Sequence, residues 1–90
     1  MANLQSAKKR IRQNIKRRER NRRYRSAART YIRRSRELIA DGSLDEAEEV
    51  VRLAVSTLDK AARKGVIHPN NAARRKSRIM TQLNAAKQQA

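Results

Sequence analysis

Cationic side chains crowd the first third of the chain, where 15 of the first 36 residues are Lys or Arg and Glu19 is the only acid. The densest stretch holds Lys8, Lys9, Arg10, Arg12, Lys16, Arg17, Arg18, Arg20, Arg22, Arg23 and Arg25. So many like charges repel one another unless a dense polyanion neutralises them. Nucleic acid is the usual polyanion, because its phosphates release bound counterions when protein cations replace them. The stretch therefore predicts contact with nucleic-acid phosphates.

A second basic cluster lies toward the C-terminus and comprises Arg74, Arg75, Lys76 and Arg78. Such a cluster by itself is ambiguous, because a solvated helix face looks the same. Beside the first stretch, a phosphate contact is the favoured interpretation. Arginine outnumbers lysine 17 to 7 over the chain, which suits bidentate phosphate contacts and stacking on exposed bases.

The chain carries little that could perform catalysis or hold a metal ion. It has no cysteine, no glycine-rich loop and a single histidine, His68. One imidazole cannot build a zinc site alone, so we expect His68 either to cap a helix or to hydrogen-bond RNA. Helix capping and i,i+4 pairs such as Glu48–Arg52 and Asp59–Arg63 account for the central carboxylates. The sequence therefore predicts no enzyme, no cofactor and no metal site.

Membrane association is not expected either. No apolar run approaches the roughly 18 residues of a membrane span, and a membrane-surface helix would need a wider apolar face. The opening residues lack the apolar core of a secretion signal, so we expect a soluble, intracellular protein.

Gly42, Gly65 and Pro69 are the only glycines and proline, and they fall where helices are expected to end or begin. We predict a first helix over about residues 6–40. The second begins at a capping box formed by Ser43 and Glu46 and ends at Lys64, with Gly65 as a left-handed C′ residue. The third begins near Pro69 and continues through residue 86. The prediction is an all-α fold with no strand.

Apolar residues at helical spacing predict how these helices pack. One face of each predicted helix carries such a stripe. In the first helix it consists of Tyr24, Ala27, Ala28, Tyr31, Ile32, Leu38 and Ile39. In the second it consists of Leu44, Ala47, Val51, Ala54, Leu58 and Ala61, and in the third of Ala72, Ile79, Met80, Leu83 and Ala86. Short connections make neighbouring helices antiparallel. Lys76 falls within the third stripe and must snorkel or mark its edge. Tyr24 and Tyr31 could stack on bases, although their spacing favours core packing.

The stripe does not extend into the basic stretch. Leu4, Ala7, Ile11 and Ile15 share a face that points roughly 135° from the later stripe on a straight helix. The cations of residues 8–25 scatter around the whole circumference. We therefore predict a single domain over residues 1–90, in which 1–23 form a basic helical extension and 24–90 form a three-helix antiparallel bundle.

Two runs of residues resemble a known family. The opening run is ANLQSAKKR from Ala2 to Arg10, and the more specific run is KAARKGVIH from Lys60 to His68, followed by Asn70 and further basic residues. Over the whole chain, the sequence resembles the S-twenty family of bacterial small-subunit ribosomal proteins. Pro69 departs from the pattern, which would place a polar or basic residue there.

The resemblance implies a protein that binds small-subunit ribosomal RNA early in assembly, at the 5′ domain and the long penultimate helix. By matching positions, the RNA contacts would fall on the first basic stretch and on His68, Asn70, Arg74, Arg75, Lys76 and Arg78. It also implies contacts with other ribosomal components only peripherally, and a location in the cytoplasm or an organelle stroma. Repulsion between the like charges of two copies predicts no homo-oligomer. A DNA-compacting protein remains the alternative, although no groove-reading motif is present.

Overall fold

The computed structural model describes residues 2–89, with side chains from residue 4 onward. Within that range it is all-α: α1 spans Ala2–Asp41, α2 spans Leu44–Arg63 and α3 spans Pro69–Gln89. The prediction of three helices without a strand is confirmed. Both outer helices are longer than predicted, since α1 begins four residues before residue 6 and α3 ends three residues after residue 86.

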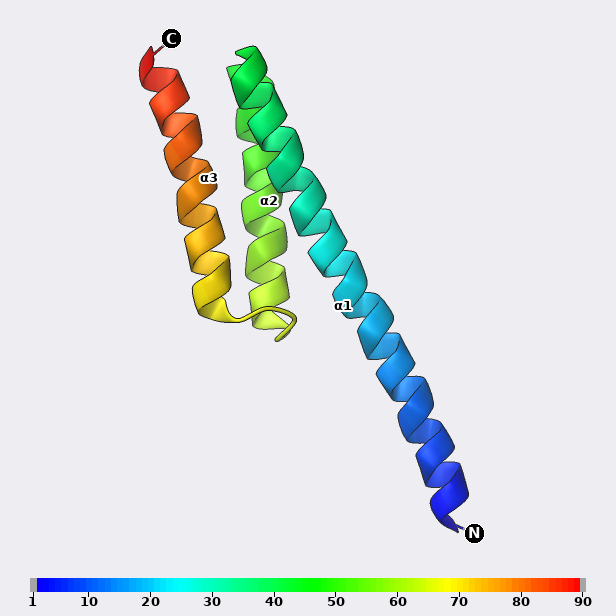
Figure 1. Cartoon of the computed structure of the whole chain (residues 1–90). Helices are drawn as coiled ribbons and strands as arrows, with labels where there is room; N and C mark the ends of the chain where they lie inside the picture. The colour runs from blue at the N-terminus through cyan, green and yellow to red at the C-terminus, as the bar shows by residue number, and fades with distance from the viewer. Residues whose placement is uncertain (1, 90) are drawn as a thin grey trace.

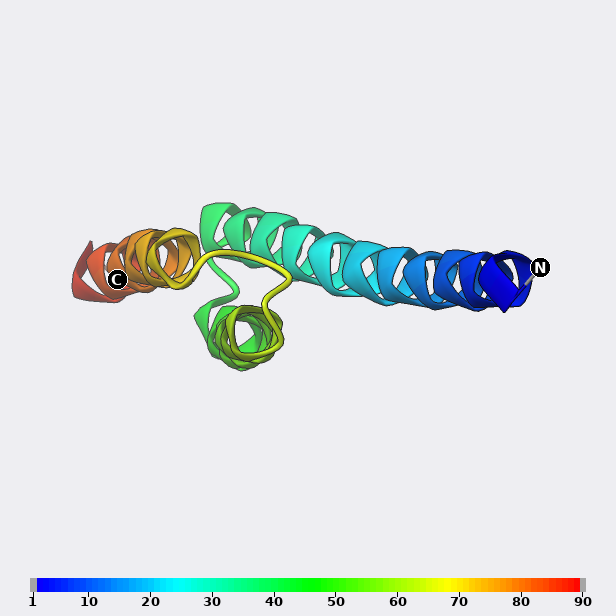
Figure 2. The same cartoon turned by 90° about the horizontal axis from the view of Figure 1, so that it is seen from below.

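The helices form a bundle with one long projection (Figure 1). α2 runs back antiparallel along the C-terminal half of α1, and α3 runs antiparallel to α2. Seen from below, α2 lies to one side of the line formed by α1 and α3 (Figure 2). The N-terminal half of α1 continues past the α2–α3 connection with no helix beside it, which accounts for a longest dimension of 68 Å.

Glycine ends both α1 and α2 in the same way. Gly42 and Gly65 have φ angles of 81° and 76°, a region that L side chains rarely adopt. After α1, the Ser43 N–H donates to the Leu38 carbonyl over 3.0 Å, and after α2 the Val66 N–H donates to the Ala61 carbonyl over 2.8 Å. Each pattern is a Schellman motif, which satisfies carbonyls that the helix end leaves unpaired. The predicted role of Gly65 is confirmed.

The predicted capping box at the start of α2 is wrong. Ser43 is the N-cap residue, but its side chain makes no capping hydrogen bond. A capping box would also need the Ser43 N–H to donate to Glu46. That N–H is already used by the Leu38 carbonyl, so the end of α1 competes with the start of α2 for the same donor.

Two clusters of buried side chains hold the bundle together. The first, near the α1–α2 turn, consists of Leu38, Ala47, Val51, Ile79 and Leu83. The second, near the α2–α3 loop, consists of Ala28, Leu58 and Ala72, with Ile32, Ala62 and Ile67 packed against it. Each cluster draws residues from all three helices, so the predicted stripes do face one another. Two details differ: Met80 is 46% exposed, and Ser35, which was not predicted, is fully buried.

Ser35 can be buried because its hydroxyl donates to the Tyr31 carbonyl over 2.7 Å within α1. A hydroxyl that bonds to its own helix loses little on leaving water. Along α1, Ser35 lies between Ile32, which packs against the second cluster, and Leu38, which belongs to the first.

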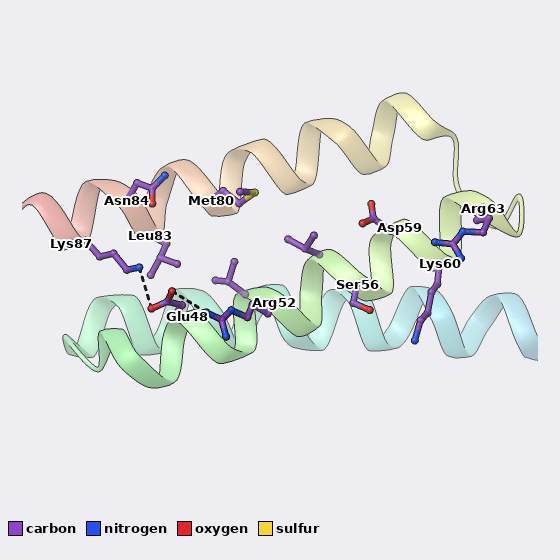
Figure 3. Close-up of a pocket in the computed structure, with 12 residues that line it drawn as sticks. Glu48, Arg52, Ser56, Asp59, Lys60, Arg63, Met80, Leu83, Asn84 and Lys87 are labelled. Carbon is purple, nitrogen blue, oxygen red and sulfur yellow. Dashed lines mark hydrogen bonds and ion pairs between the residues drawn. The ribbon is translucent and has the colours of Figure 1, made fainter.

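Ion pairs connect α3 to α2. Lys87 Nζ lies 3.1 Å from Glu48 Oε2, and Arg52 donates to the other oxygen of the same carboxylate over 3.3 Å (Figure 3). The Lys87 hydrogen bond, more than the charge of Arg52, holds the pKa of Glu48 below its ordinary value. The Glu48–Arg52 pair was predicted. Asp59 was assigned to Arg63, but it instead accepts from Lys76 Nζ over 2.6 Å.

No helix within residues 2–89 is both long enough and apolar enough to cross a membrane.

Candidate nucleic-acid interface

The predicted cations from Lys8 to Arg18 lie on the projecting half of α1, whereas Arg20, Arg23 and Arg25 lie where α1 meets the end of α2 and the loop after it. Every side chain from residue 4 to residue 19 is exposed, including Leu4, Ile11 and Ile15. Arg20 is the first half-buried cation, and Arg22, Arg23 and Arg25 are exposed. The projection is therefore a helical rod with cations available on all sides. Its division from the bundle at residue 23 stays a prediction.

An arginine stripe runs along α1 from this rod into the bundle. Its members recur at intervals of three or four residues: Arg18, Arg22, Arg25, Arg29, Arg33 and Arg36. At 100° per residue, all six fall within about 80° of arc. A shallow hollow beside the stripe is lined by polar side chains from Asn14 to Arg29. The stripe gives one side of α1 a continuous row of guanidinium groups.

A groove between α1 and α3 continues this surface. Arg29, Arg33 and Arg36 of α1 line it together with Arg75 and Arg78 of α3. Its remaining lining consists of one apolar and one acidic side chain, those of residues 32 and 37. The acid is Glu37, which already faces a cation, because Arg34 Nη1 lies 3.5 Å from its carboxylate. The fold thus places five arginines from two helices around one groove.

The groove contains three residues that were not predicted as part of the interface, namely Arg29, Arg33 and Arg36. A signal was present in the sequence, since these arginines extend the three-to-four spacing that begins at Arg18. Searching only for dense runs of cations misses them, because their neighbours include apolar and acidic residues. Their proximity to Arg75 and Arg78 depends on how α3 packs, which no local pattern shows.

The predicted residues at the start of α3 lie in several environments. His68 caps the helix, because its Nδ1 accepts a hydrogen bond from the Asn70 N–H over 3.1 Å. Asn70 and Arg74 are exposed. Lys76 is half-buried and its ammonium group is paired with Asp59, so it has less charge to offer a phosphate than Arg75 or Arg78. The capping role expected for His68 is confirmed, and an RNA contact by its other ring nitrogen stays a prediction.

Arg25 links the rod to the loop between α2 and α3. Its Nη2 donates to the Val66 carbonyl over 3.1 Å, across 41 residues of sequence. That loop leads through the His68 cap into the basic part of α3. Arg25 therefore helps to hold the two predicted clusters in one orientation, besides adding its own charge to the stripe.

Apart from Glu37, which lines the α1–α3 groove, most acidic side chains of α2 and of the turn before it lie away from this surface. All acids except Glu19 lie between residues 37 and 59. Asp41, Asp45, Glu46 and Glu49 are exposed around the turn that joins α1 to α2, at the end of the bundle farthest from the rod. We call the arginine stripe of α1, together with Arg75 and Arg78 of α3, the arginine surface. Because like charges repel, a polyanion on the arginine surface would approach from the rod side and avoid this turn.

Among the described residues, no group of three or more His, Cys, Asp or Glu side chains is arranged to hold a metal ion. The basic surface offers guanidinium and ammonium groups at many points, and these groups are ligands for phosphate. What it can do is bind phosphates.

Comparison with known proteins agrees with this geometry. A family model described as Ribosomal protein S20 matches residues 2–84. The Small ribosomal subunit protein bS20 of Thermomicrobium roseum is 53% identical over 85 residues, covering 94% of this chain and 86% of that protein. The proteins of the same name from Bifidobacterium animalis subsp. lactis and Aquifex aeolicus are 52% and 48% identical, and the alignments cover 94% and 99% of this chain and 99% and 95% of those proteins.

A family model that spans nearly the whole chain, and relatives that are about half identical over nearly their full length, leave one conclusion. The chain belongs to the ribosomal protein S20 family.

Proposed function

We propose that this chain is a structural constituent of the small ribosomal subunit, where it binds ribosomal RNA directly and stabilises the packing of RNA helices during assembly. Membership in a structural ribosomal protein family confirms that the chain is not an enzyme. The relatives are named small ribosomal subunit proteins, which supports the assignment of this chain to the small subunit. The proposed RNA partners are the 5′ domain and the long penultimate helix. The proposed location is the cytoplasm, with other ribosomal components touched only peripherally and no homo-oligomer.

The observation that carries direct RNA binding is the continuous arginine surface from Arg18 to Arg78. Six arginines of α1 lead into the groove that Arg75 and Arg78 complete. Arginine presents a planar fork that binds phosphate oxygens in pairs. A surface on two helices can contact two RNA segments and fix their relative orientation, which a flexible cationic tail cannot do.

The rod adds a second mode of contact. Its cations point in all directions, which suits a helix surrounded by phosphates on several sides rather than one lying in a single groove. Leu4, Ile11 and Ile15 lie within the same arc of α1 as the arginine stripe and continue it toward the N-terminus. RNA that covers the stripe would therefore also cover these exposed apolar side chains.

The direct test compares binding partners at one salt concentration. The full chain is titrated with transcripts of the 5′ domain and of the penultimate helix, and with duplex DNA of matched length. Tighter binding to the two RNA transcripts supports the proposal. Equal binding to all three would instead support the DNA-compacting alternative, since phosphates alone would then decide affinity.

Neutralising the α1–α3 groove is expected to weaken RNA binding and its salt dependence together. Each lost phosphate contact flattens the slope of log K against log salt by about 0.9, so Arg33→Gln with Arg75→Gln should flatten it by about 2. The matched control is Arg52→Gln with Arg63→Gln, which removes two charges from α2, outside the groove. Equal slopes for the two double variants would show that the groove binds no phosphate.

RNA binding is also expected to protect the rod from amide hydrogen exchange. Residues 8–19 have no buried side chain, and a helix without a packed face opens readily in water. Phosphates supply the missing countercharge and stabilise the ordered helix by mass action. Exchange of residues 8–23 should be fast in the free chain and slow in the complex. Strong protection before RNA is added would contradict this coupling of folding to binding.

A further inference from the structure

Both aromatic side chains of the protein line one groove between α1 and α2. Tyr24 and Tyr31 lie in it beside Arg20 and Arg23 of α1, and Lys60 contributes from α2. The rest of the lining is Ala27 and Thr57. No carboxylate lines the groove. It is therefore a cationic groove that contains both tyrosines of a chain without Phe or Trp.

The two tyrosines do not belong to the buried core of the bundle. Each is half-buried, and neither belongs to the two clusters of buried side chains or to the apolar residues packed against them. Lys64 Nζ lies 6.0 Å from the centroid of the Tyr24 ring, at the outer limit of a cation–π contact. Sequence spacing favoured core packing for these rings, but the structure leaves part of each ring at the surface.

The cations of the groove are also available to a ligand. Among residues 4–89, no carboxylate lies within ion-pair distance of Arg20, Arg23 or Lys60. The Nε atom of Arg20 is buried without a hydrogen-bond partner. The guanidinium group of Arg20 therefore has no partner among these residues that an incoming phosphate would have to displace.

We propose that this groove binds one nucleotide with an unpaired base, whose ring stacks on Tyr24 and Tyr31 while Arg20, Arg23 and Lys60 hold its phosphate. The inference rests on the proposed RNA-binding function and names a site within it. A base inside a duplex has no free face, whereas a base in a bulge or loop can stack on an aromatic side chain. Phosphate alone would need only the cations.

The position of the groove makes it a contact separate from the arginine surface. At 100° per residue, Tyr24 and Tyr31 lie about 150° around α1 from the middle of the arginine stripe. RNA in the tyrosine groove and RNA in the α1–α3 groove would therefore approach α1 from opposite sides. A bulged nucleotide would give α1 a fixed register along one of its RNA partners, which phosphate contacts do not supply.

Tyrosine fluorescence reports this site directly, because the chain has two tyrosines and no tryptophan. The full chain is titrated with an RNA hairpin that carries one bulged adenosine, with the same hairpin fully paired, and with adenosine monophosphate. The bulged hairpin should bind more tightly and quench the emission. Tyr24→Leu should weaken its binding about 5- to 150-fold and leave the paired hairpin unaffected, whereas Tyr24→Phe should bind like the unaltered chain.

Other results distinguish a failure of the tyrosine site from a failure of the proposed function. Equal binding of the bulged and paired hairpins, or equal losses for both in Tyr24→Leu, would overturn the tyrosine site and leave general RNA binding intact. Failure of the unaltered chain to bind either hairpin, with binding to the ribosomal transcripts retained, would overturn the tyrosine site alone. Failure to bind the hairpins and the transcripts would overturn the proposed function as well. Quenching by adenosine monophosphate that the bulged hairpin does not displace would assign the groove to a free nucleotide and overturn the RNA site. If Tyr24→Leu alters the thermal unfolding transition, Tyr31→Leu replaces it and should weaken binding of the bulged hairpin while leaving the paired hairpin unaffected.

Discussion

Reversing Arg17, Arg18, Arg22 and Arg23 to Glu is expected to abolish binding to ribosomal RNA while leaving the thermal unfolding transition of the bundle nearly unchanged. All four side chains are exposed, and none of them belongs to a cluster of buried residues. The change replaces four attractive contacts with four repulsive ones. Losing four phosphate contacts should also flatten the slope of log K against log salt by about 4, since each contact contributes about 0.9.

Two matched variants separate the effect of positive charge from the effect of the guanidinium geometry. Replacing the same four residues with Lys keeps the charge and removes the bidentate fork, so affinity should fall only modestly. Replacing them with Gln removes the attraction without adding repulsion, so the RNA affinity of this variant should lie between those of the Glu and Lys variants. The measurements are RNA titration at fixed salt and a circular dichroism melt. A variant that loses its helical transition would show that the rod belongs to the folding unit, contrary to the predicted division at residue 23.

The fold could be predicted from sequence because each determinant is local. Gly42 and Gly65 end helices wherever the chain meets them, since they adopt a positive φ at little cost. The stripe of Ala47, Val51 and Leu58 selects the buried face of α2. The failures arose where two elements compete for one group. Ser43 could not serve a capping box, because its N–H completes the end of α1.

The interface was less predictable, because part of it exists only after packing. Runs of consecutive cations identify the rod, which needs no tertiary contact to present its charges. The α1–α3 groove requires α3 to lie beside the second half of α1, so Arg33 and Arg75 become neighbours across it. Asp59 likewise pairs with Lys76 rather than with Arg63, because α3 brings a cation closer than the next turn of α2 does. Spacing along one helix cannot reveal either arrangement.

Truncating Leu58 to Ala is expected to destabilise the bundle by about 2–5 kcal/mol, the usual cost of a cavity in a packed core. Leu58 is fully buried and packs with Ala28 of α1 and Ala72 of α3, so its loss weakens all three helix contacts. Leu83→Ala should have a similar effect in the other cluster. Small domains have a total stability of about 5–15 kcal/mol, and this core lacks Phe and Trp. Urea unfolding followed by circular dichroism measures the change.

Leu53→Ala is the matched control, because Leu53 lies on the same helix but is 49% exposed. It should cost well under about 1 kcal/mol, as surface substitutions usually do. Equal losses at Leu53 and Leu58 would mean that α2 does not bury the face on which the interface depends. RNA should partly restore the Leu58→Ala variant, since a ligand at 100 times its Kd stabilises the folded state by about 2.7 kcal/mol. Such rescue would show that RNA binds the folded bundle more tightly than the unfolded chain, and its absence would show that the cations bind RNA equally well without the bundle.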